Sequence, residues 1–442
     1  MTHPHPSRVR QAAPSLGALC IPPLICYSFS AMKRGIDRRR FLRAAGFGVL
    51  APVWDSVSRA AGKAKVFHLK ITDLKTFVVN VGRVNWVFCK VYTNQGLVGL
   101  GEGSVTSKEA TIAQAIMEHK RFLVGKDPTD IELLWQGMFR YPRWRGGPVL
   151  NSAISAVEIA LWDILGQALG VPIYKLLGGG ARKRIRMYKD VGSRPEAFLQ
   201  AKEEGYTAAK SGFIRVDDNL VIPHFAVREG IRRLEAVRKA VGDDFDVCVD
   251  AHGKLTTVMA IEFCTGVEHL RPFFVEEPTQ LEDLDELALL RQKTRVPLAT
   301  GERSFTKYGF TAFCERHLVN YIQPDVVHAG GILEMKKIGA IAEAHRVEMA
   351  PHNPQSEVST MASLHVDATT PACVIQEYNP RREAWIQDLF HGEGAVVRDG
   401  FAELPGKPGL GVRLNEKVAA KHPYRPVNRP NYVFRDGGVA DH

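Results

Sequence analysis

Three acidic residues stand at a regular spacing in the middle of this 442-residue chain. Asp250, Glu276 and Glu302 each follow a short apolar run, and 26 residues separate each one from the next. A single acid in such a position is usually a helix N-cap or a solvated turn residue. Three in phase would repel one another unless a cation lay between them, and carboxylate oxygens suit a hard cation such as Mg²⁺. We therefore interpret these residues as the ligands of a metal site.

Two further ionisable residues continue this spacing. Asp325 follows Glu302 by 23 residues, and His352 follows Asp325 by 27 residues. On neighbouring strand ends, an aspartate can hydrogen-bond one ring nitrogen of a histidine, which fixes the tautomer and raises the basicity of the other nitrogen. A lone histidine between prolines is usually structural, but beside an acid and a metal site we favour a general base. Glu377, after the last apolar run, is a further candidate as a hydrogen-bond donor or acid.

The stretch V-C-V-D-A-H-G-K, residues 247–254, ends an apolar run with two ionisable groups. Because successive side chains alternate along a strand, we expect Asp250 and His252 to point to the same side, and Val249 and Ala251 to the other. Taken alone, the pattern is more typical of an ordinary strand end that enters a turn. The role of His252 therefore depends on its surroundings.

Residues of this kind need a scaffold that brings many strand ends together. From about residue 185, short apolar segments alternate with polar turns and helical patterns, which predicts eight parallel strands in a closed barrel. In such barrels the active site lies at the carboxyl ends of the strands, where these charged residues stand. The eight segments are R-M-Y-K-D-V-G, T-A-A-K-S-G, D-V-C-V-D-A-H-G, F-F-V-E-E-P, P-L-A-T-G-E, Y-I-Q-P-D-V-V, E-M-A-P-H-N-P and C-V-I-Q-E-Y.

The part of the chain before residue 185 has a different pattern of apolar and polar residues. Residues 66–105 alternate between apolar and polar side chains like antiparallel strands, with a hairpin-like N-Q-G turn. Helical patterns follow at 107–124 and 150–169, and Gly170 is a plausible helix end. These patterns predict an α+β unit before the barrel.

The net charge of +10 suggests nucleic-acid binding at first sight. Residues 1–60 hold nine Lys/Arg and two Asp/Glu, a net charge of +7, whereas the remaining 49 basic and 46 acidic residues sum to +3. Since the basic charge is concentrated in a leader, we do not expect a nucleic-acid partner.

The leader has the pattern of a twin-arginine export signal. The basic run D-R-R-R-F-L-R, residues 37–43, precedes the weakly apolar A-A-G-F-G-V-L-A-P-V and the small-residue sequence S-R-A-A. The apolar stretch is too short for a transmembrane helix, so we expect no membrane association of the mature form. Met32 offers a later start codon, in which case residues 1–31 would not be translated. The expectation is a periplasmic protein, with a cytoplasmic location as the alternative.

The cysteines give no support for disulfide bonds. Cys20 and Cys26 lie in the leader, and the other five are scattered within apolar patterns without a C-x-x-C motif. We expect these five to be buried thiols, and they are Cys89, Cys248, Cys264, Cys314 and Cys373.

In its order of short motifs, the chain from about residue 69 to 412 resembles the enolase superfamily, mandelate racemase subgroup. Within that subgroup it is most similar to the D-galactonate dehydratase-type acid-sugar dehydratases. Each motif is weak alone, but their order and spacing together are highly specific. The matching stretches are R-G-G-P, A-L-W-D-I, D-A-H-G, V-E-E-P, G-E-R, Q-P-D, H-A-G-G, A-P-H and Q-E.

The resemblance implies an α/β fold, a (β/α)8-type (modified TIM) barrel with an N-terminal α+β capping domain. It divides the chain into the leader 1–60, a capping domain 66–186, a barrel 187–385 and a C-terminal segment 386–442 that returns to the capping domain and ends in a tail. We also expect a homo-oligomer.

The same resemblance assigns roles to the site residues. It makes Asp250, Glu276 and Glu302 the ligands of Mg²⁺, and it makes Asp325 and His352 the dyad that removes the proton α to the substrate carboxylate. It excludes the second glutamate of V-E-E-P as a ligand.

The resemblance further implies that His252 is the acid that protonates the departing 3-hydroxyl group and that Glu377 supports the enediolate. Racemases of the subgroup carry K-x-K on the second strand, whereas here Lys210 is followed by Gly212 at the second position. The missing lysine favours dehydration over racemisation. Lys210 is then a candidate partner of the substrate carboxylate, or a solvated strand-end lysine.

The capping-domain loop V-G-R-V-N-W should close the site and select the sugar. Arg83, Asn85 and Arg145 are candidate contacts for substrate hydroxyl or carboxylate groups.

The expected function is Mg²⁺-dependent dehydration of a small-molecule sugar acid, D-galactonate or a close epimer, to a 2-keto-3-deoxy acid through an enediolate. Two alternatives stay open: an epimerase, racemase or cycloisomerase of the same superfamily, and a catalytically silent sugar-acid-binding protein.

Overall fold

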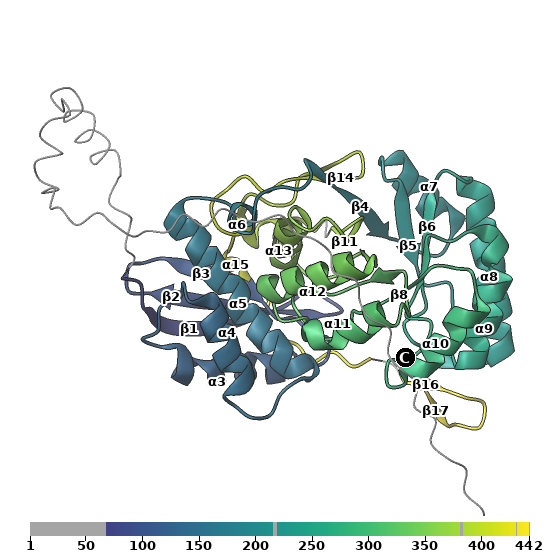
Figure 1. Ribbon diagram of the computed structural model, residues 1–442, viewed down its shortest axis with the longest axis horizontal. Helices are drawn as coiled ribbons and strands as arrows, with labels where there is room; N and C mark the ends of the chain where they lie inside the picture. Colours follow the sequence, from purple (N-terminus) through teal and green to yellow (C-terminus); the bar gives the residue numbers. More distant parts are fainter. Residues whose placement is uncertain (1–67, 215–218, 381–382, 430, 442) are drawn as a thin grey trace, which may run out of the picture. The chain divides into compact units, whose positions relative to one another are not determined.

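The structure is a computed structural model that describes residues 68–214, 219–380, 383–429 and 431–441 (Figure 1). The leader with its arginine run and the two cysteines Cys20 and Cys26 lie outside the described residues. The twin-arginine signal and the start at Met32 therefore stay predictions.

The chain begins its described part with a three-stranded antiparallel sheet. Its strands pair in the order β1 (Ile71–Asn80), β2 (Asn85–Thr93) and β3 (Val98–Glu102). The N-Q-G turn joins the last two strands, and Gly96 takes a left-handed φ of 78° there. The predicted hairpin turn is confirmed.

Helix α5 (Gly147–Leu169) packs directly on strand β3. Glycines occupy two alternate positions of this strand and the position just after it, and a Cβ atom on Gly99, Gly101 or Gly103 would lie 2.0, 1.9 or 2.6 Å from a backbone oxygen of the helix. The absence of side chains therefore allows the helix backbone to rest on the strand. The helix ends at the predicted Gly170, which is left-handed with φ 73°.

Three other helices complete this unit: α3 (Glu109–Leu123), α4 (Ile131–Arg140) and α6 (Ile173–Leu176). Within the described part of the chain, α5 alone is long and apolar enough to cross a membrane. Most of that helix is buried inside the protein, as expected for a core helix.

Eight parallel strands form the barrel, as predicted. The first seven pair in chain order, the eighth pairs with the first, and a bridge between Met349 and Cys373 joins the seventh strand to the segment before the eighth. The strands are β4 (Arg184–Asp190), β5 (Ala208–Ser211), β6 (Asp246–Asp250), β7 (Phe274–Glu276), β8 (Leu298–Thr300), β9 (Tyr321–Ile322), β10 (Glu348–Met349) and β11 (Gln376–Tyr378).

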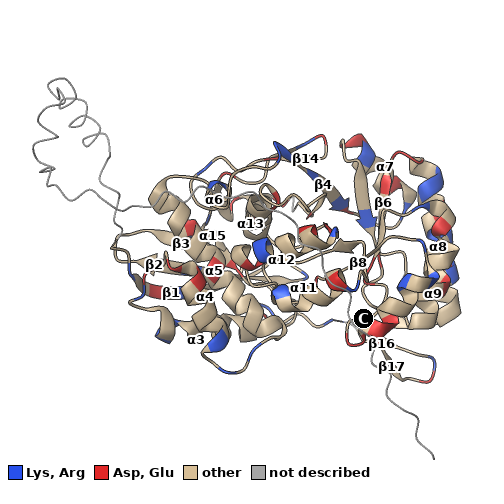
Figure 2. Ribbon diagram, viewed as in Figure 1, with Lys and Arg blue, Asp and Glu red and all other residues tan. Residues whose placement is uncertain are grey.

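Helices between the strands cover the outside of this barrel (Figure 1). They are α7 (Pro195–Glu203), α8 (Pro223–Val241), α9 (Thr257–Gly266), α10 (Leu284–Lys293), α11 (Thr306–Glu315), α12 (Ile332–His345) and α13 (Glu357–Asp367), with a 3₁₀ turn at Glu268–Leu270. Lysine and arginine occur together with aspartate and glutamate on these outer helices (Figure 2). This mixture agrees with the near-neutral charge of the chain after the leader.

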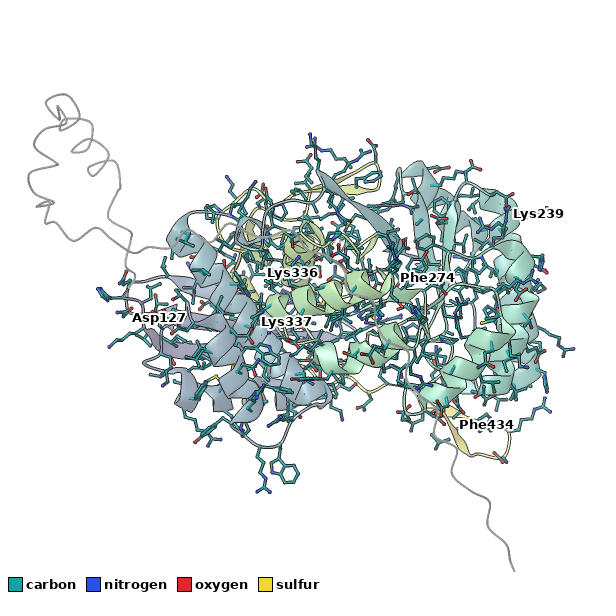
Figure 3. All side chains as sticks on the ribbon, in the orientation of Figure 1. Asp127, Lys239, Phe274, Lys336, Lys337 and Phe434 are labelled. Carbon is teal, nitrogen blue, oxygen red and sulfur yellow. The ribbon has the colours of Figure 1, made fainter. Side chains whose placement is uncertain are left out.

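The barrel strands bury their two faces in separate apolar clusters. One face contributes residues such as Met187, Val249 and Leu298 to the large core beneath the helices. The other face forms a small cluster inside the barrel, where the rings of Tyr188 and Phe274 lie 6.0 Å apart. Figure 3 labels Phe274 among the side chains of the barrel. This inner cluster fills the barrel, as in other closed eight-stranded barrels.

The inner cluster also positions the polar residues. Because side chains alternate along a strand, the residue two positions after an inner apolar residue points to the same side, one layer nearer the carboxyl end. Six strands or strand extensions follow this rule, with the pairs Tyr188 and Asp190, Ala208 and Lys210, Cys248 and Asp250, Phe274 and Glu276, Ala350 and His352, and Ile375 and Glu377. The fold thereby gathers charged side chains above an apolar floor.

Helix α5 also anchors the barrel helix that follows β9. The Glu158 carboxylate accepts the backbone N–H groups of Ile332 and Leu333 at 2.7 and 2.8 Å, at the start of α12. Burial raises the pKa of Glu158 to about 8, although these N–H donors oppose the shift. The Trp135 indole donates to the Gly330 carbonyl beside this helix start at 2.8 Å.

The chain after the barrel packs against β1 and β2. Phe390 lies 5.8 Å from Phe88, and the Asn80 N–H donates to the His422 carbonyl at 2.9 Å. The elements of this part are α14 (Ala384–Gln387), β12 (Phe390–Gly392), β13 (Val397–Arg398), β14 (Phe401–Glu403), β15 (Val412–Leu414), α15 (Glu416–Ala419), β16 (Tyr432–Val433) and β17 (Val439–Ala440).

The last residues run from the first sheet to the barrel. Asn85 exchanges two hydrogen bonds with the Arg425 backbone, at 3.0 and 3.2 Å. Further along, the Val221 N–H donates to the Val433 carbonyl at 2.8 Å. We call residues 425–441 the C-terminal strap. All five predicted thiols of the described chain are free and buried.

Candidate active site

A cavity of about 520 Å³ lies at the carboxyl ends of the barrel strands. Barrel residues with ionisable side chains line it together with residues of the first domain and of the C-terminal strap. The lining residues are Val84, Val105, Thr106, Ser107, Pro148, Asp190, Lys210, Asp250, His252, Glu302, Arg303, Phe305, His328, His352, Pro354, Gln355, Glu377, Asn379 and Arg429.

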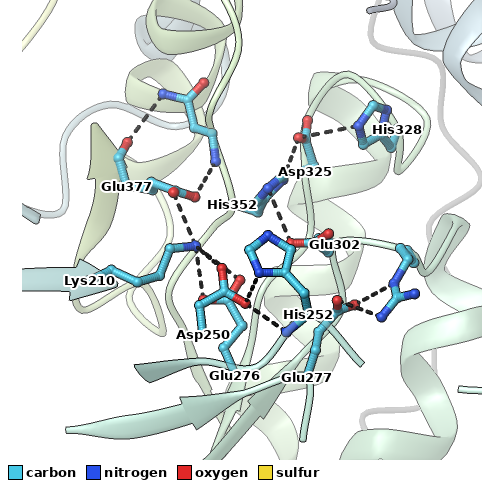
Figure 4. Close-up of polar contacts among 12 residues, drawn as sticks. Lys210, Asp250, His252, Glu276, Glu277, Glu302, Asp325, His328, His352 and Glu377 are labelled. Atoms are coloured by element: carbon cyan, nitrogen blue, oxygen red, sulfur yellow. Dashed lines mark hydrogen bonds and ion pairs between the residues drawn. The ribbon is translucent and has the colours of Figure 1, made fainter. Parts of the chain in front are cut away.

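Lys210 occupies the centre of the charged group, with only 3% of its side chain exposed (Figure 4). Its Nζ lies 3.4 Å from Asp250 Oδ2, 3.0 Å from Glu276 Oε2 and 3.0 Å from Glu377 Oε1. Burial alone lowers the pKa of Lys210, but the surrounding carboxylates outweigh it and hold that pKa well above its ordinary value. The lysine therefore stays charged and neutralises part of the acidic cluster.

The three predicted metal ligands stand on consecutive strands. Asp250 and Glu276 are direct neighbours in the parallel register of β6 and β7, and Glu302 follows the end of β8 by two residues. The Oε2 atoms of both glutamates are buried and accept no hydrogen bond, although Lys210 and His352 lie within ion-pair distance of them.

The pKa values of these three carboxyl groups are shifted in different directions. Burial raises the pKa of Glu276 well above its usual value, and the neighbouring carboxylates add to that rise. For Glu302 burial acts in the same direction, but the charge of His352 outweighs it and lowers the pKa. The pKa of Asp250 is also lowered, because the charges of His252 and Lys210 outweigh the effect of burial.

As arranged here, no group of three or more His, Cys, Asp or Glu side chains among the described residues is spaced to hold a metal ion. The types of ligand atom nevertheless fit a hard cation. Glu276 and Glu302 each offer a carboxylate oxygen that is buried and without a hydrogen bond. Lys210 and His352 supply positive charge to these same oxygens.

His352 bridges two acids in the cavity (Figure 4). Its Nδ1 lies 2.8 Å from Asp325 Oδ2, and its Nε2 lies 3.2 Å from Glu302 Oε2. Burial alone lowers the pKa of His352, but the negative charges of Glu302, Asp325 and Glu377 hold it well above its ordinary value. The structure therefore brings the predicted dyad together beside the carboxylate cluster.

His252 reaches the same cavity by a route that the sequence did not indicate. Strand β6 ends at Asp250, and His252 lies in the following turn with a left-handed φ of 54°, so strand alternation does not extend to it. Instead, its N–H and its Nδ1 each lie 3.0 Å from Asp250 Oδ1. The side chain is 48% exposed and lines the cavity.

Glu377 completes the ring from β11. Its Oε2 accepts the backbone N–H of Asn353 at 2.9 Å, while Oε1 pairs with Lys210. Both oxygens are therefore held in place within the cluster.

The three expected sugar contacts do not line the cavity. Arg83 is exposed to solvent, and the Arg145 guanidinium lies 5.4 Å from the centre of the Phe139 ring. Asn85 is buried, and its amide is engaged with the Arg425 backbone and with Asn80. The nearby residues Val84 and Pro148 line the cavity instead.

The structure adds four charged or ionisable residues that sequence reasoning did not select. Asp190 ends β4, and burial raises its pKa to about 7. His328, within the motif H-A-G-G, places Nε2 3.5 Å from Asp325 Oδ2. Arg303 follows the third candidate ligand directly, and Arg429 comes from the C-terminal strap. The motif and the strand end were signals for His328 and Asp190, but nothing local pointed to Arg429.

Two family descriptions match the chain. "Mandelate racemase / muconate lactonizing enzyme, N-terminal domain" covers residues 63–178, and "Enolase C-terminal domain-like" covers residues 195–418. Among curated proteins, the D-galactonate dehydratase of Verminephrobacter eiseniae is 36% identical over 386 residues, which is 84% of this chain and 100% of that protein. The D-galactonate dehydratase of Variovorax paradoxus is 37% identical with the same coverage.

Solved structures agree with this result. An enolase from Pantoea ananatis with bound D-gluconate and Mg has a TM-score of 0.78 and 31% identity, over 84% of this chain and 99% of that chain. The 3,6-anhydro-D-galactonate cycloisomerase of Zobellia galactanivorans has a TM-score of 0.73 and 29% identity, over 80% of this chain and 100% of that chain.

Proposed function

The chain belongs to the enolase superfamily, in its mandelate racemase subgroup close to galactonate dehydratase, and from that premise we propose that it is a hydro-lyase that dehydrates a sugar acid. The proposed substrate is D-galactonate or a close epimer, and the product is the 2-keto-3-deoxy acid. Similarity to curated D-galactonate dehydratases and to a gluconate-bound relative supports this class of substrate.

One observation carries the proposal: the cavity holds two histidines, each paired with its own aspartate, beside one carboxylate cluster (Figure 4). Dehydration needs a base at C2 and an acid at the 3-hydroxyl group. His352 with Asp325 suits the base, and His252 suits the acid because it is half exposed to the cavity.

Asp250, Glu276 and Glu302 are the proposed ligands of Mg²⁺. When bound, the ion supplies positive charge that stabilises the enediolate formed from the substrate carboxylate. The buried glutamate oxygens without hydrogen bonds support this assignment.

The protein residues then carry the proton transfers. His352 takes the proton from C2 through Nε2, while Asp325 holds the ring at Nδ1. In the structure Nε2 pairs with Glu302, and it would become available as a base when Glu302 instead holds the metal ion. His252 delivers a proton to the hydroxyl group on C3, which leaves as water while the C2–C3 double bond forms. The resulting enol rearranges to the 2-keto acid, so one water molecule is lost and no redox partner is needed. Glu377 and Lys210 hold opposite charges in the cluster beside the reacting carboxylate.

The decisive test is a stereochemically complete set of aldonic acids with Mg²⁺, assayed for keto-acid formation and for deuterium uptake at C2 in D₂O. The wild-type protein should release a 2-keto-3-deoxy acid from D-galactonate or a close epimer. Exchange at C2 with inversion and no loss of water would instead identify an epimerase. Tight binding of a sugar acid without either reaction would identify a silent binding protein.

The division of roles between the histidines is tested by two matched variants. His252→Asn should block elimination, by about 10²- to 10⁴-fold, and leave C2 exchange measurable. His352→Asn should abolish both reactions. If exchange also vanished in His252→Asn, the two roles would be assigned wrongly.

We also propose export by the twin-arginine route, on the basis of the leader sequence. Changing Arg38, Arg39 and Arg40 to lysine should retain the protein in the cytoplasm, as measured by cell fractionation. Unchanged distribution would support a cytoplasmic enzyme.

A further inference from the structure

The proposed acid, His252, is held by Asp250 through both its backbone N–H and its Nδ1. Its imidazole is 48% exposed, and its φ of 54° is one that residues with a side chain adopt rarely. Gly253 follows with φ 63°, so two consecutive residues are left-handed. A turn of this kind keeps one conformation only when neighbouring groups hold it.

The neighbouring segment after β7 holds this turn. The Gly253 N–H donates to the Glu277 carbonyl at 2.8 Å, and the Gln280 amide donates to the Gly253 carbonyl at 2.9 Å. The residue directly after His252 is therefore bound on both its N–H and its C=O.

Arg303 in turn holds both partners of Gly253. Its guanidinium binds the Glu277 carboxylate with two hydrogen bonds of 2.9 and 2.6 Å, and a third N–H donates to Gln280 Oε1 at 2.8 Å. Only 1% of the Glu277 side chain is exposed, so its carboxylate is shielded from water, whereas 36% of the Arg303 side chain is exposed. The planar guanidinium fork suits three such acceptors in a way that a lysine ammonium group does not.

The guanidinium also lies directly against the turn. A Cβ atom on Gly253 would be 2.4 Å from Arg303 Nη2 and 3.0 Å from the Gln280 amide. Any movement of the arginine thus changes the space available to the residue after His252. Figure 4 shows His252 and Glu277 on neighbouring turns beside the carboxylate cluster.

From these contacts we propose that Arg303 is a positioning residue for His252: through Glu277 and Gln280 it holds the turn 251–254 so that the imidazole stays over Asp250 and faces the cavity. The inference rests on the proposed dehydration, in which His252 is the acid. Arg303 therefore acts on the elimination step and not on proton removal by His352, which a different strand carries.

Two variants test this role with different risks to folding. Arg303→Lys keeps a positive charge for Glu277 but loses the fork, and Gln280→Leu removes the bridge to Gly253 without leaving a buried charge unpaired. Arg232→Lys is the matched control, because Arg232 makes a similar ion pair with Glu229 on the outer surface, with 72% of its side chain exposed.

We expect Arg303→Lys to lower the rate of elimination by about 100-fold while C2 exchange in D₂O changes by less than about threefold, because a displacement near 1 Å is costly for a catalytic group. Gln280→Leu should act in the same direction by about tenfold. The Mg²⁺ affinity, measured by calorimetry, should stay within about threefold in both variants, and the control should match the wild type.

A second readout does not depend on activity. Amide hydrogen exchange of residues 251–254, followed by mass spectrometry, should accelerate in Arg303→Lys and Gln280→Leu and stay unchanged in Arg232→Lys. If the wild-type protein dehydrates no sugar acid, the proposed function fails, and this readout still tests whether Arg303 holds the turn.

Two results would overturn the inference. A raised KM with an unchanged ratio of elimination to exchange would make Arg303 a substrate contact. Unchanged protection of 251–254 in both variants would show that other contacts hold the turn.

Discussion

Lys210 is buried among three carboxylates, so its removal leaves several buried negative charges without their shared cation. Its Nζ lies within 3.4 Å of Asp250, Glu276 and Glu377. Removing one member of such a buried group leaves uncompensated charges in a poorly solvated place. At the scale of single residues, the site is therefore a balance between one cation and several acids.

We predict that Lys210→Met lowers the free energy of unfolding by about 3–5 kcal/mol in EDTA. Added Mg²⁺ should recover much of that loss, since it restores positive charge among the same carboxylates, and it should stabilise the variant more than the wild type. Urea unfolding with and without Mg²⁺ measures both quantities. The control Lys239→Met, on the exposed side of α8, should change neither the free energy of unfolding nor the stabilisation by Mg²⁺ by more than about 0.5 kcal/mol. Equal Mg²⁺ effects on variant and wild type would contradict the ligand assignment.

Sequence spacing was sufficient to select the residues that stand at strand ends. Asp250, Glu276 and His352 follow apolar runs, and the barrel places such positions together. It was not sufficient for contacts that depend on loop conformation. Asn85 was selected for its loop, but its amide is used by the Arg425 backbone, far away in the sequence. Arg429 was not selected, because no local pattern relates a tail residue to the cavity.

At the scale of elements, the predicted eight strands and the N-Q-G hairpin are confirmed because alternation and turn residues are local signals. The left-handed turn at His252 was not predicted, since its conformation comes from hydrogen bonds to the next strand segment. Strand β6 is therefore shorter than the alternation argument required.

One junction between elements should make stability depend on pH. His365 on α13 is fully buried, and its Nδ1 accepts the Tyr174 N–H of α6 at 3.2 Å. Burial lowers the pKa of His365 from 6.5 to about 4. The unfolded chain therefore binds a proton at this residue below about pH 6.5, whereas the folded protein binds it only near pH 4.

Stability should accordingly be complete above about pH 6.5 and fall as the pH approaches 4, by about 3 kcal/mol from this residue. His365→Asn keeps an acceptor for Tyr174 but does not titrate. The difference in unfolding free energy between wild type and variant should shift by about that amount in favour of the variant between pH 7 and pH 4. Parallel pH profiles would show that His365 is already protonated in the fold.

At the scale of the whole molecule, the C-terminal strap connects the first sheet to the barrel and passes the cavity on the way. It is bound to Asn85 at one end and to Val221 at the other, and Arg429 between them lines the cavity. Arg429 does not contact the carboxylate cluster in any hydrogen bond or ion pair of the described residues. The strap is therefore suited to bind substrate and not to carry out the reaction.

We predict that Arg429→Ala raises KM for the sugar acid about tenfold and changes kcat by less than about threefold, since a hydrogen bond to a charged group is worth about 1.5–3 kcal/mol. Arg435→Ala, an exposed arginine of the same strap, is the control and should behave like the wild type. Steady-state kinetics with the best aldonate of the substrate screen gives both constants. A loss confined to kcat would assign Arg429 to the chemistry.

The two layers inside the barrel have a consequence for how this scaffold can change. Residues such as Tyr188 and Phe274 fill the barrel, and the ionisable residues stand two positions later on the same strands. An exchange in the upper layer alters what reaction is possible without opening a void in the lower one. Such a separation lets one architecture acquire new chemistry through a few substitutions, and it makes the upper layer the natural place to redesign the product of this enzyme.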